Sequence, residues 1–180
     1  MSAMSAQATA LGGLWPQLAR GIETEAELQS FFNKRQENTK GGKLLHIASA
    51  VKVINNASLH AFVANRNLHK DPLKAHRTGD AYIFHGCPQE IAINIQADGL
   101  KIGYAANGML GRGLYGAPDP RKSQQFCKNS PHGKFMFVCR FNLKQAQHAG
   151  PSTNHRNTIF DEFCVYDEKH VVVLWMLKLR

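Results

Sequence analysis

Long apolar segments are missing from this chain of 180 residues. No run approaches the roughly 18–20 apolar residues that a membrane-spanning helix needs. The first 19 residues carry no charged side chain, so the basic leader of a secretory signal is not expected. No internal repeat is visible either. We therefore expect a soluble domain with no membrane partner and a cytoplasmic site of action.

Closely spaced cysteines are also missing. The four cysteines are separated by 40, 12 and 25 residues, and none has the C-x₂₋₄-C spacing of a zinc site. The sequence therefore predicts no metal. Cys139 and Cys164 lie in apolar, strand-like runs, where a thiol usually packs as a small core residue. The spacing also fits a reducing compartment.

Acidic residues are scarce in one long stretch. The net charge is +9, and the acids and bases of residues 1–40 cancel, so the excess lies beyond them. Residues 101–156 hold a single acid, Asp119, against nine basic residues, which gives this stretch a net charge of +8. Such a field attracts phosphates, on a dinucleotide or on a nucleic acid, although a solubilising surface is an equally good interpretation.

The N-terminal residues read as a separate segment. Residues 1–22 are rich in Ala, Ser and Gly and are interpreted as a linker or mobile end. A helix is predicted over 24–35, because Thr24 and Glu27 form a capping-box pattern ahead of an apolar face. A glycine break follows, so residues 1–42 are expected to be a linker with a short helix, and 43–180 a folded domain.

The remaining pattern mixes short strands with few helices, which predicts an α+β fold. Two glycine-rich or polar stretches, 103–113 and 142–160, are expected to be loops. Pro72 and Gly79 mark a further loop. Helices are expected over about 56–63, 89–97 and 119–128, and strands over about 47–53, 82–84, 114–115, 135–141, 163–166 and 171–179.

Three segments carry residue types suited to chemistry. The first is Phe84-His85-Gly86-Cys87-Pro88, the second runs from Gly111 through Tyr115 to Cys127, and the third is Asp161 to Asp167. In this order and at these separations they resemble the catalytic domain of the poly(ADP-ribose) polymerase family, in its diphtheria-toxin-like, His-Tyr-Glu branch. The similarity runs from about residue 45 to residue 180. It implies an ADP-ribosyltransferase fold of two packed, mostly antiparallel sheets with flanking helices, and it makes 43–180 the catalytic domain.

The resemblance implies a catalytic set of His85, Tyr115 and Glu162. The ring of His85 would donate a hydrogen bond to a hydroxyl of the adenosine ribose of NAD⁺. Glu162 would hold the 2′-hydroxyl of the nicotinamide ribose and stabilise the cationic transition state of glycosidic cleavage. Residues 103–113 resemble the donor loop that folds over NAD⁺.

Five residues are implied to bind NAD⁺ besides His85. The backbone of Gly86 would pair with the nicotinamide carboxamide, and Ser123 would add a third hydrogen bond. Tyr115 and Phe126 would stack on the nicotinamide ring, although the family usually has Tyr at the second position. Lys101 would lie near the adenine and phosphates.

Other features depart from the family pattern. Cys87 stands where the family usually has Ser or Thr, and it reads either as a ribose contact or as a packed thiol. Residues 1–44 leave no room for a helical regulatory domain, so the site is expected to be constitutively open. The stretch 142–160 carries His148, His155 and Arg156 but no acid, which favours transfer of single units over polymer synthesis.

The function implied by the resemblance is transfer of ADP-ribose from NAD⁺ to a macromolecular acceptor, with release of nicotinamide. The acceptor would be a protein or a structured nucleic acid such as RNA, bound through the basic stretch. The chain also resembles the toxin tips of secreted or injected bacterial effectors, for which an immunity or inhibitor protein would be a partner. Two alternatives stay open: a module that binds NAD⁺ or ADP-ribose without turnover, and an NAD⁺ glycohydrolase. Taken singly, each site residue also has an ordinary structural interpretation.

Overall fold

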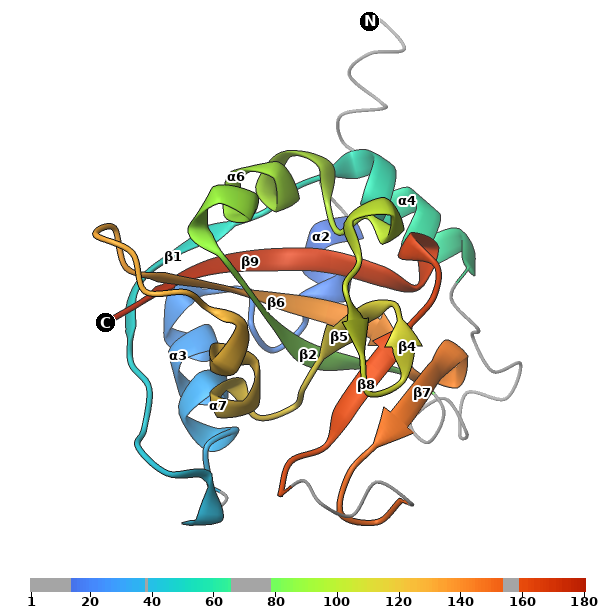
Figure 1. Ribbon diagram of the computed structural model, residues 1–180. Coiled ribbons are helices and arrows are strands. Elements are labelled where there is room, and N and C mark those ends of the chain that lie inside the picture. The colour runs from blue at the N-terminus through green and yellow to red at the C-terminus, as the bar shows by residue number, and fades with distance from the viewer. Residues whose placement is uncertain (1–13, 38, 66–78, 154–158) are drawn as a thin grey trace, which may run out of the picture.

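The computed structural model describes residues 14–37, 39–65, 79–153 and 159–180. Its centre is a four-stranded antiparallel sheet with strand order β1-β9-β6-β2 (Figure 1). A second antiparallel sheet has the order β5-β8-β7, and β3 and β4 form a small hairpin. The strands are β1 (Ile47–Lys52), β2 (Asp80–Cys87), β3 (Asn107–Gly108), β4 (Gly111–Arg112), β5 (Leu114–Gly116), β6 (Lys134–Asn142), β7 (Ala146–Ala149), β8 (Glu162–Val165) and β9 (Val171–Leu179).

Short helices flank the two sheets. The α-helices are α2 (Leu14–Leu18), α3 (Glu25–Lys34), α4 (Asn56–Asn65), α6 (Gln89–Asp98) and α7 (Pro120–Ser123). Single 3₁₀ turns are η1 (Thr39–Gly41), η2 (Ile102–Tyr104), η3 (Gln124–Phe126), η4 (Leu143–Gln145) and η5 (Glu168–His170). Two packed antiparallel sheets with flanking helices confirm the predicted α+β architecture. No helix among the described ranges is long and apolar enough to cross a membrane.

The two central strands of the large sheet, β6 and β9, are mostly buried on both faces, which is why they are almost continuously apolar. One face packs against α2, α3 and α4, with a core that includes Leu18, Leu28, Phe32, Leu59, Phe62, Phe84, Val138 and Leu174. The other face packs against α6 and the three-stranded sheet, with a core that includes Ile83, Ile95, Leu114, Phe137, Cys139, Val165 and Val173. The second core brings β2 next to β5, where the candidate site lies.

A β-bulge in β9 changes which residues face the helices. The register with β6 shifts between Val138, opposite Trp175, and Cys139, opposite Val173. As a result Leu174 and Trp175, although adjacent, both join the core on the helix side. The indole N–H of Trp175 donates to the carbonyl of Ile22 (2.8 Å), which ties the bulge to the N-terminal residues.

The N-terminal segment differs from the linker expected over residues 1–22. Residues 14–18 form α2, and Trp15 and Leu18 are buried in the same core as the sheet. The indole N–H of Trp15 donates to the carbonyl of Leu174 (3.2 Å). Hydrophobic burial therefore overrides the small-residue composition of this segment from residue 14 onward. The domain boundary near residue 42 stays a prediction, but the helices before it share one core with the strands after it.

Several local predictions are confirmed and others are wrong in detail. The capping box is present: Thr24 Oγ1 accepts from the N–H of Glu27, and Glu27 accepts from the N–H of Thr24 (3.0 Å). The expected loops at 103–113 and 142–160 hold the β3–β4 hairpin and β7, respectively. Strands of two to four residues are too short to show an alternating pattern. The predicted loop at Pro72 lies outside the described residues.

Candidate active site

His85 links the two sheets. It lies near the end of β2, opposite Phe137 of β6, and its Nδ1 is 2.7 Å from the carbonyl oxygen of Tyr115 in β5. A carbonyl oxygen can only accept, so Nδ1 carries the proton. Burial lowers the pKa of His85, while the bond to the Tyr115 carbonyl acts in the opposite direction. The imidazole is therefore neutral at physiological pH, and its Nε2 is an acceptor.

Gly86 lies on an edge of β2 whose backbone groups face β5 and α7. Phe84 exchanges both backbone hydrogen bonds with Ala117 across this edge (2.8 and 2.9 Å). Backbone groups of alternate residues point to the same side of a strand, so the N–H and C=O of Gly86 point this way too. A Cβ on Gly86 would overlap the carbonyl oxygen of Ser123 and lie 2.9 Å from Cys127 Sγ. Only glycine allows α7 to pack this closely.

Ser123 is 2% exposed and donates its hydroxyl proton to the carbonyl of Phe84 (2.6 Å). The hydroxyl oxygen keeps its acceptor capacity beside the Gly86 edge. The helix that carries Ser123 begins as predicted, with Asp119 as N-cap and Pro120 in the first turn. Arg121 then holds the helix in place through two bonds to the Asp119 carboxylate (2.6 and 3.0 Å) and one to the carbonyl of Gly42 (3.3 Å). The helix is shorter than the predicted 119–128, because η3 follows it directly.

The register of the three-stranded sheet places Tyr115 and Glu162 on one face. Tyr115 pairs directly with Cys164, and Glu162 lies two residues before Cys164, at the start of β8. Side chains two residues apart on a strand point the same way, and such diagonal neighbours have Cα atoms about 7–8 Å apart. Together with the His85–Tyr115 bond, the register brings all three predicted catalytic residues to one site.

Glu162 is a buried carboxylate beside a lysine. It is 5% exposed, and its Oε1 lies 3.8 Å from Nζ of Lys122 on α7. Burial raises the pKa of Glu162, and the Lys122 ammonium opposes that shift. Lys122 lies within the second motif segment, but the family resemblance implied no role for it. The signal available was its position next to Ser123, which the resemblance placed at the nicotinamide.

Phe126 stands at the open side of the site. It ends η3 and is 50% exposed, and Nζ of Lys122 lies 5.7 Å from the centroid of its ring. The Lys122 ammonium is therefore close to both the Glu162 carboxylate and the Phe126 ring. A half-exposed aromatic ring offers a flat apolar surface to a planar ligand.

The phenol of Tyr115 is bonded to the β3–β4 hairpin, which we name the 107–112 hairpin. Its hydroxyl accepts from the N–H of Leu110 (2.8 Å) and donates to the carbonyl of Gly111 (2.6 Å). Burial raises the pKa of Tyr115 to about 12, so the phenol stays protonated. The expected donor loop is therefore a hairpin held against Tyr115.

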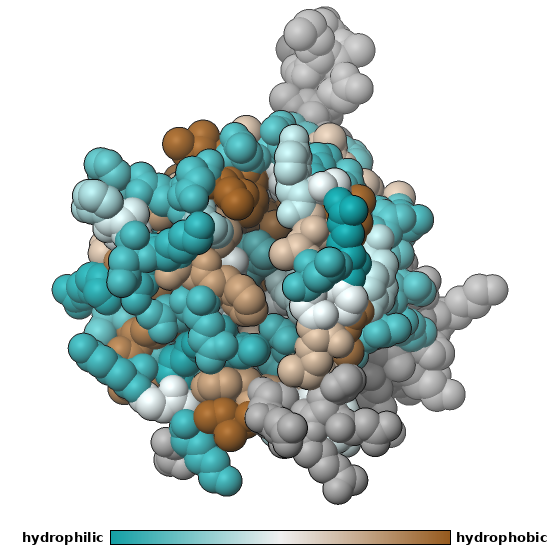
Figure 2. Space-filling view, in the orientation of Figure 1, coloured by the Kyte–Doolittle hydropathy of each residue, from teal (hydrophilic) through white to brown (hydrophobic). Residues whose placement is uncertain are grey.

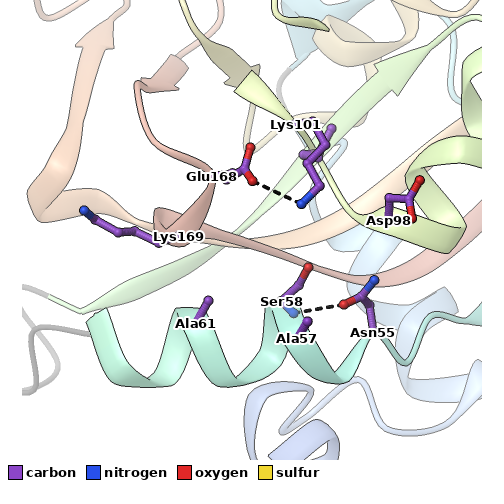
Figure 3. A pocket seen from close by; sticks show the side chains of 9 residues that line it. Asn55, Ala57, Ser58, Ala61, Asp98, Lys101, Glu168 and Lys169 are labelled. Atoms are coloured by element: carbon purple, nitrogen blue, oxygen red, sulfur yellow. Dashed lines mark hydrogen bonds and ion pairs between the residues drawn. The ribbon is translucent and has the colours of Figure 1, made fainter. Parts of the chain in front are cut away.

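Lys101 is placed apart from the other predicted site residues. Its Nζ is 3.0 Å from Glu168 Oε1 (Figure 3). Glu168 also accepts from the N–H of Ile102. Both side chains line a pocket of about 440 Å³ between α4, the end of α6 and η5. None of His85, Gly86, Tyr115, Ser123, Phe126 or Glu162 lines that pocket. The predicted contact of Lys101 with NAD⁺ thus gains no support from its placement.

The thiols of the site region are packed and protonated. Cys87 is 3% exposed, and burial raises its pKa to about 12. Of its two interpretations, the packed thiol agrees with this burial. All four cysteines are free and buried, as expected for Cys139 and Cys164. Within the described ranges, no group of three or more His, Cys, Asp and Glu side chains is placed to hold a metal ion.

On the opposite face of β7 and β8, His148 forms a pair with Asp161. Its Nε2 lies 2.7 Å from Asp161 Oδ1, and its ring stacks on Phe163 with centroids 4.6 Å apart. His148 pairs in the sheet with Phe163, the residue that follows Glu162 on β8, and adjacent residues of a strand point to opposite faces. The imidazole therefore points away from the Glu162 face and braces β7 against β8. Figure 2 shows that the side of the molecule carrying these strands is mostly hydrophilic and hollowed near its centre.

The chain matches a known family of catalytic domains. A model of the poly(ADP-ribose) polymerase catalytic domain matches residues 23–158. Comparison with curated proteins finds no match. The matched range contains His85, Gly86, Tyr115, Ser123 and Phe126 and ends before β8. It covers more than half of the chain, so the chain belongs to the poly(ADP-ribose) polymerase catalytic-domain family.

Membership confirms the predicted resemblance and the ADP-ribosyltransferase fold. Catalytic domains of this family use NAD⁺ as substrate, and membership supports ADP-ribosyl transfer from NAD⁺ in general for this chain. Because the match ends before Glu162, the place of that residue rests on the β5–β8 register and on its ion pair with Lys122.

Proposed function

We propose that this chain transfers single ADP-ribose units from NAD⁺ to a macromolecular acceptor and releases nicotinamide. One observation carries the proposal. The β5–β8 register places Glu162 on the face of Tyr115, and the Tyr115 carbonyl holds the ring of His85. A neutral acceptor, an aromatic ring and a buried carboxylate are thereby grouped beside the open edge of β2.

The nicotinamide end would bind at that edge. A primary carboxamide needs one donor and one acceptor in line, which the N–H and C=O of Gly86 supply. The hydroxyl of Ser123 donates its one hydrogen bond to the carbonyl of Phe84 (2.6 Å), so it would accept from the second amide N–H of nicotinamide rather than donate. Tyr115 and Phe126 would flank the ring.

His85 would act on the adenosine ribose as an acceptor. The family resemblance implies that the ring donates to the ribose, but Nδ1 already donates to the carbonyl of Tyr115 (2.7 Å). The remaining nitrogen of the neutral ring has a lone pair and no proton, so it would accept from a ribose hydroxyl. The proposed partner of His85 is therefore still the adenosine ribose, with the ring as acceptor rather than donor.

Glu162 would stabilise the reacting sugar. In the proposed step, the bond between ribose C1′ and the nicotinamide nitrogen breaks, and the electron pair stays on nitrogen as neutral nicotinamide leaves. The sugar becomes cationic, and the Glu162 carboxylate accepts from its 2′-hydroxyl and faces that charge. A lone pair of the acceptor then forms the new bond to C1′, and the acceptor loses a proton to water.

Two features support transfer of single units. A growing chain would need a second site for bound ADP-ribose beside Glu162. The strand that pairs with β8 at Glu162 is β7, which has only four residues, and its Ala149 is the residue paired with Glu162. Among the described residues of 142–160, His148 is occupied by Asp161 (2.7 Å). His155 and Arg156 lie outside the described residues.

We infer the acceptor class from how the basic residues of 101–156 are placed in the folded chain. Of the nine cations in 101–156, Arg121 is buried on Asp119 and the side chain of Arg140 is 16% exposed beside Asp80. Lys101 and Lys122 are paired with carboxylates, at 3.0 and 3.8 Å. The folded chain therefore presents less of this charge than the sequence suggests, which favours a protein acceptor over RNA.

The test is incubation of purified chain with NAD⁺ labelled in the adenosine moiety, in a cell lysate. The labelled product is then digested separately with protease and with nuclease. We expect label on macromolecules that protease releases and nuclease does not, free nicotinamide in equal amount, and loss of both with Glu162→Gln. Label released by nuclease alone would move the acceptor to nucleic acid.

The same experiment separates the alternatives. Nicotinamide released without labelled macromolecules would make the chain an NAD⁺ glycohydrolase. Saturable NAD⁺ binding without nicotinamide release would make it a binding module. The toxin origin, an immunity partner and a cytoplasmic site of action stay part of the proposal; expression in a host cell, with growth compared between wild type and Glu162→Gln, tests them together.

A further inference from the structure

The tip of the 107–112 hairpin is bonded to two tyrosine hydroxyls. The Tyr115 hydroxyl accepts from the N–H of Leu110 and donates to the carbonyl of Gly111, as described above. Tyr166, just after β8, donates to the carbonyl of Leu110 (2.6 Å). Both backbone groups of Leu110 are thus bonded to phenols, so the hairpin depends on side chains of the underlying sheet for its position.

Tyr166 has a second polar neighbour. Its hydroxyl lies 2.8 Å from Oε1 of Gln147 on β7. A hydroxyl has one proton and cannot donate to two carbonyl oxygens at once. Turning the Gln147 amide by 180° satisfies every group, because its NH₂ then donates to Tyr166, which donates to Leu110. The result is a relay from β7 through Tyr166 to the hairpin.

The sheet register explains why these groups meet. Gln147, Cys164 and Tyr115 lie side by side across β7, β8 and β5, and Tyr166 follows Cys164 by two residues. They therefore share one face, which is also the face of Glu162. The hairpin rests on this face so closely that a Cβ on Gly108 would lie 2.6 Å from Cζ of Tyr115.

We propose that Tyr166 is a positioning residue that holds the 107–112 hairpin against the sheet and thereby fixes the ring of Tyr115 for nicotinamide. This inference rests on the proposed function. The ring of Tyr115 lies under Gly108, and its hydroxyl is bonded to the tip, so a hairpin that lifts takes away both constraints. Tyr166 touches no reacting atom in this scheme; it acts through the hairpin.

The test compares Tyr166→Phe with Tyr104→Phe. Tyr166→Phe keeps the ring and removes only the hydroxyl, and the freed Leu110 carbonyl is near solvent, so the fold should be retained. Tyr104, on η2 in the same segment, is 88% exposed and serves as the control. For Tyr166→Phe we expect the KM for NAD⁺ to rise by about three- to tenfold, the loss of one neutral hydrogen bond. The kcat should stay within about twofold, since a uniform binding loss leaves it unchanged.

Amide hydrogen exchange gives a readout independent of NAD⁺. The peptide containing 107–112 should exchange several-fold faster in Tyr166→Phe than in wild type, with no change in Tyr104→Phe. The relay adds a second expectation: Gln147→Leu and Tyr166→Phe should be non-additive in KM, because either change breaks the same chain.

Each contrary result has one meaning. Unchanged amide exchange of the 107–112 peptide in Tyr166→Phe would show that Tyr166 does not hold the hairpin. Faster exchange with an unchanged KM would overturn the positioning role, as would a lower kcat at the same KM. If wild-type protein neither binds nor cleaves NAD⁺, the proposed function fails. Faster exchange in the variant would then show a structural tie without a positioning role.

Discussion

Two opposing effects act on the pKa of Glu162. Burial raises the pKa of its carboxyl group, and the Lys122 ammonium lowers it, with burial the larger effect. The proposed reaction needs the ionised form, whereas folding favours the protonated one. When a carboxyl has a raised pKa in the folded state, the free energy of unfolding falls as pH rises through that pKa. The site therefore costs stability at neutral pH, in the usual trade-off between function and stability.

Replacing Glu162 by Gln should separate the two properties. Glu162→Gln keeps the shape and removes the charge, so nicotinamide release should fall by about 10²–10³-fold. The Tm at neutral pH should be higher than that of wild type, and the difference should shrink as pH falls below the raised pKa. Thermal unfolding at a series of pH values measures this. An equal difference at every pH would contradict the assigned burial of the carboxylate.

Lys122 should set the acid limit of activity. Its ammonium lies 3.8 Å from Glu162 and favours the carboxylate, so Lys122→Met should raise the pKa of Glu162 further. The acid limb of the kcat profile should then move to higher pH. Lys128→Met is the control, because the Lys128 side chain is 72% exposed and lies 3.9 Å from Glu90. Profiles of kcat against pH for wild type, Lys122→Met and Lys128→Met measure this shift. An acid limb at the same pH in Lys122→Met and wild type would contradict an effect of Lys122 on the pKa of Glu162.

At the scale of elements, the 107–112 hairpin depends on a glycine that touches Tyr115. Gly108→Ala would bring a methyl group against the ring of Tyr115, 2.6 Å from Cζ. An overpacked contact costs about 1–3 kcal/mol, so the KM for NAD⁺ should rise by roughly tenfold or more as the hairpin or ring moves. Gly103→Ala is the matched control, since a Cβ there meets nothing within 4 Å. Equal KM values for the two variants would show that the hairpin does not seat on the ring.

The elements whose signals are local could be predicted from the sequence. The Thr24–Glu27 capping box and the Asp119–Pro120 helix start each depend on residues within one turn, and both are present. The β9 bulge could not be predicted, because it goes with tertiary contacts such as that of Trp175 with Trp15, 160 positions earlier in the chain. A run of apolar residues such as Val171 to Leu179 carries no sign of where its register slips.

The candidate site shows the same division. The motifs predicted His85, Tyr115 and Glu162 as the catalytic set, and the folded chain brings them near one another, while their roles stay predictions. The ion pair of Lys101 with Glu168, 67 residues further along the chain, could not be predicted, because it depends on how η5 packs. Hydrogen-bond direction at His85 and Ser123 could not be read either, because the Tyr115 and Phe84 carbonyls that fix it come from packing.

At the scale of the whole molecule, the N-terminal helices are part of the sheet's core. Trp15 and Trp175 contact edge to face with ring centroids 5.5 Å apart, and each indole donates to a backbone carbonyl of the other segment. The family match begins at residue 23, after α2. A helix outside the matched range therefore packs directly on β9, the strand that joins β1 to β6 in the large sheet.

Trp15→Ala should consequently destabilise the entire domain rather than free a tail. Trp15 is 4% exposed, and truncating a buried Trp to Ala typically costs about 3–5 kcal/mol. In a domain of this size the Tm should fall by roughly 6–20 °C. Well below that Tm the kcat should stay near wild type, because Trp15 contacts Leu174, Trp175 and Lys52, none of which is a proposed site residue.

The control for Trp15→Ala is Ile93→Ala, a truncation on the outer side of α6 where Ile93 is 71% exposed. This change should move the Tm by no more than about 2 °C, since surface substitutions usually stay within about 0.5 kcal/mol. Thermal unfolding followed by circular dichroism gives both values, and a single cooperative transition is expected in each case. A Trp15→Ala protein with the Tm of Ile93→Ala would mean that the first helix is a detachable linker after all, and that the domain begins where the family match does.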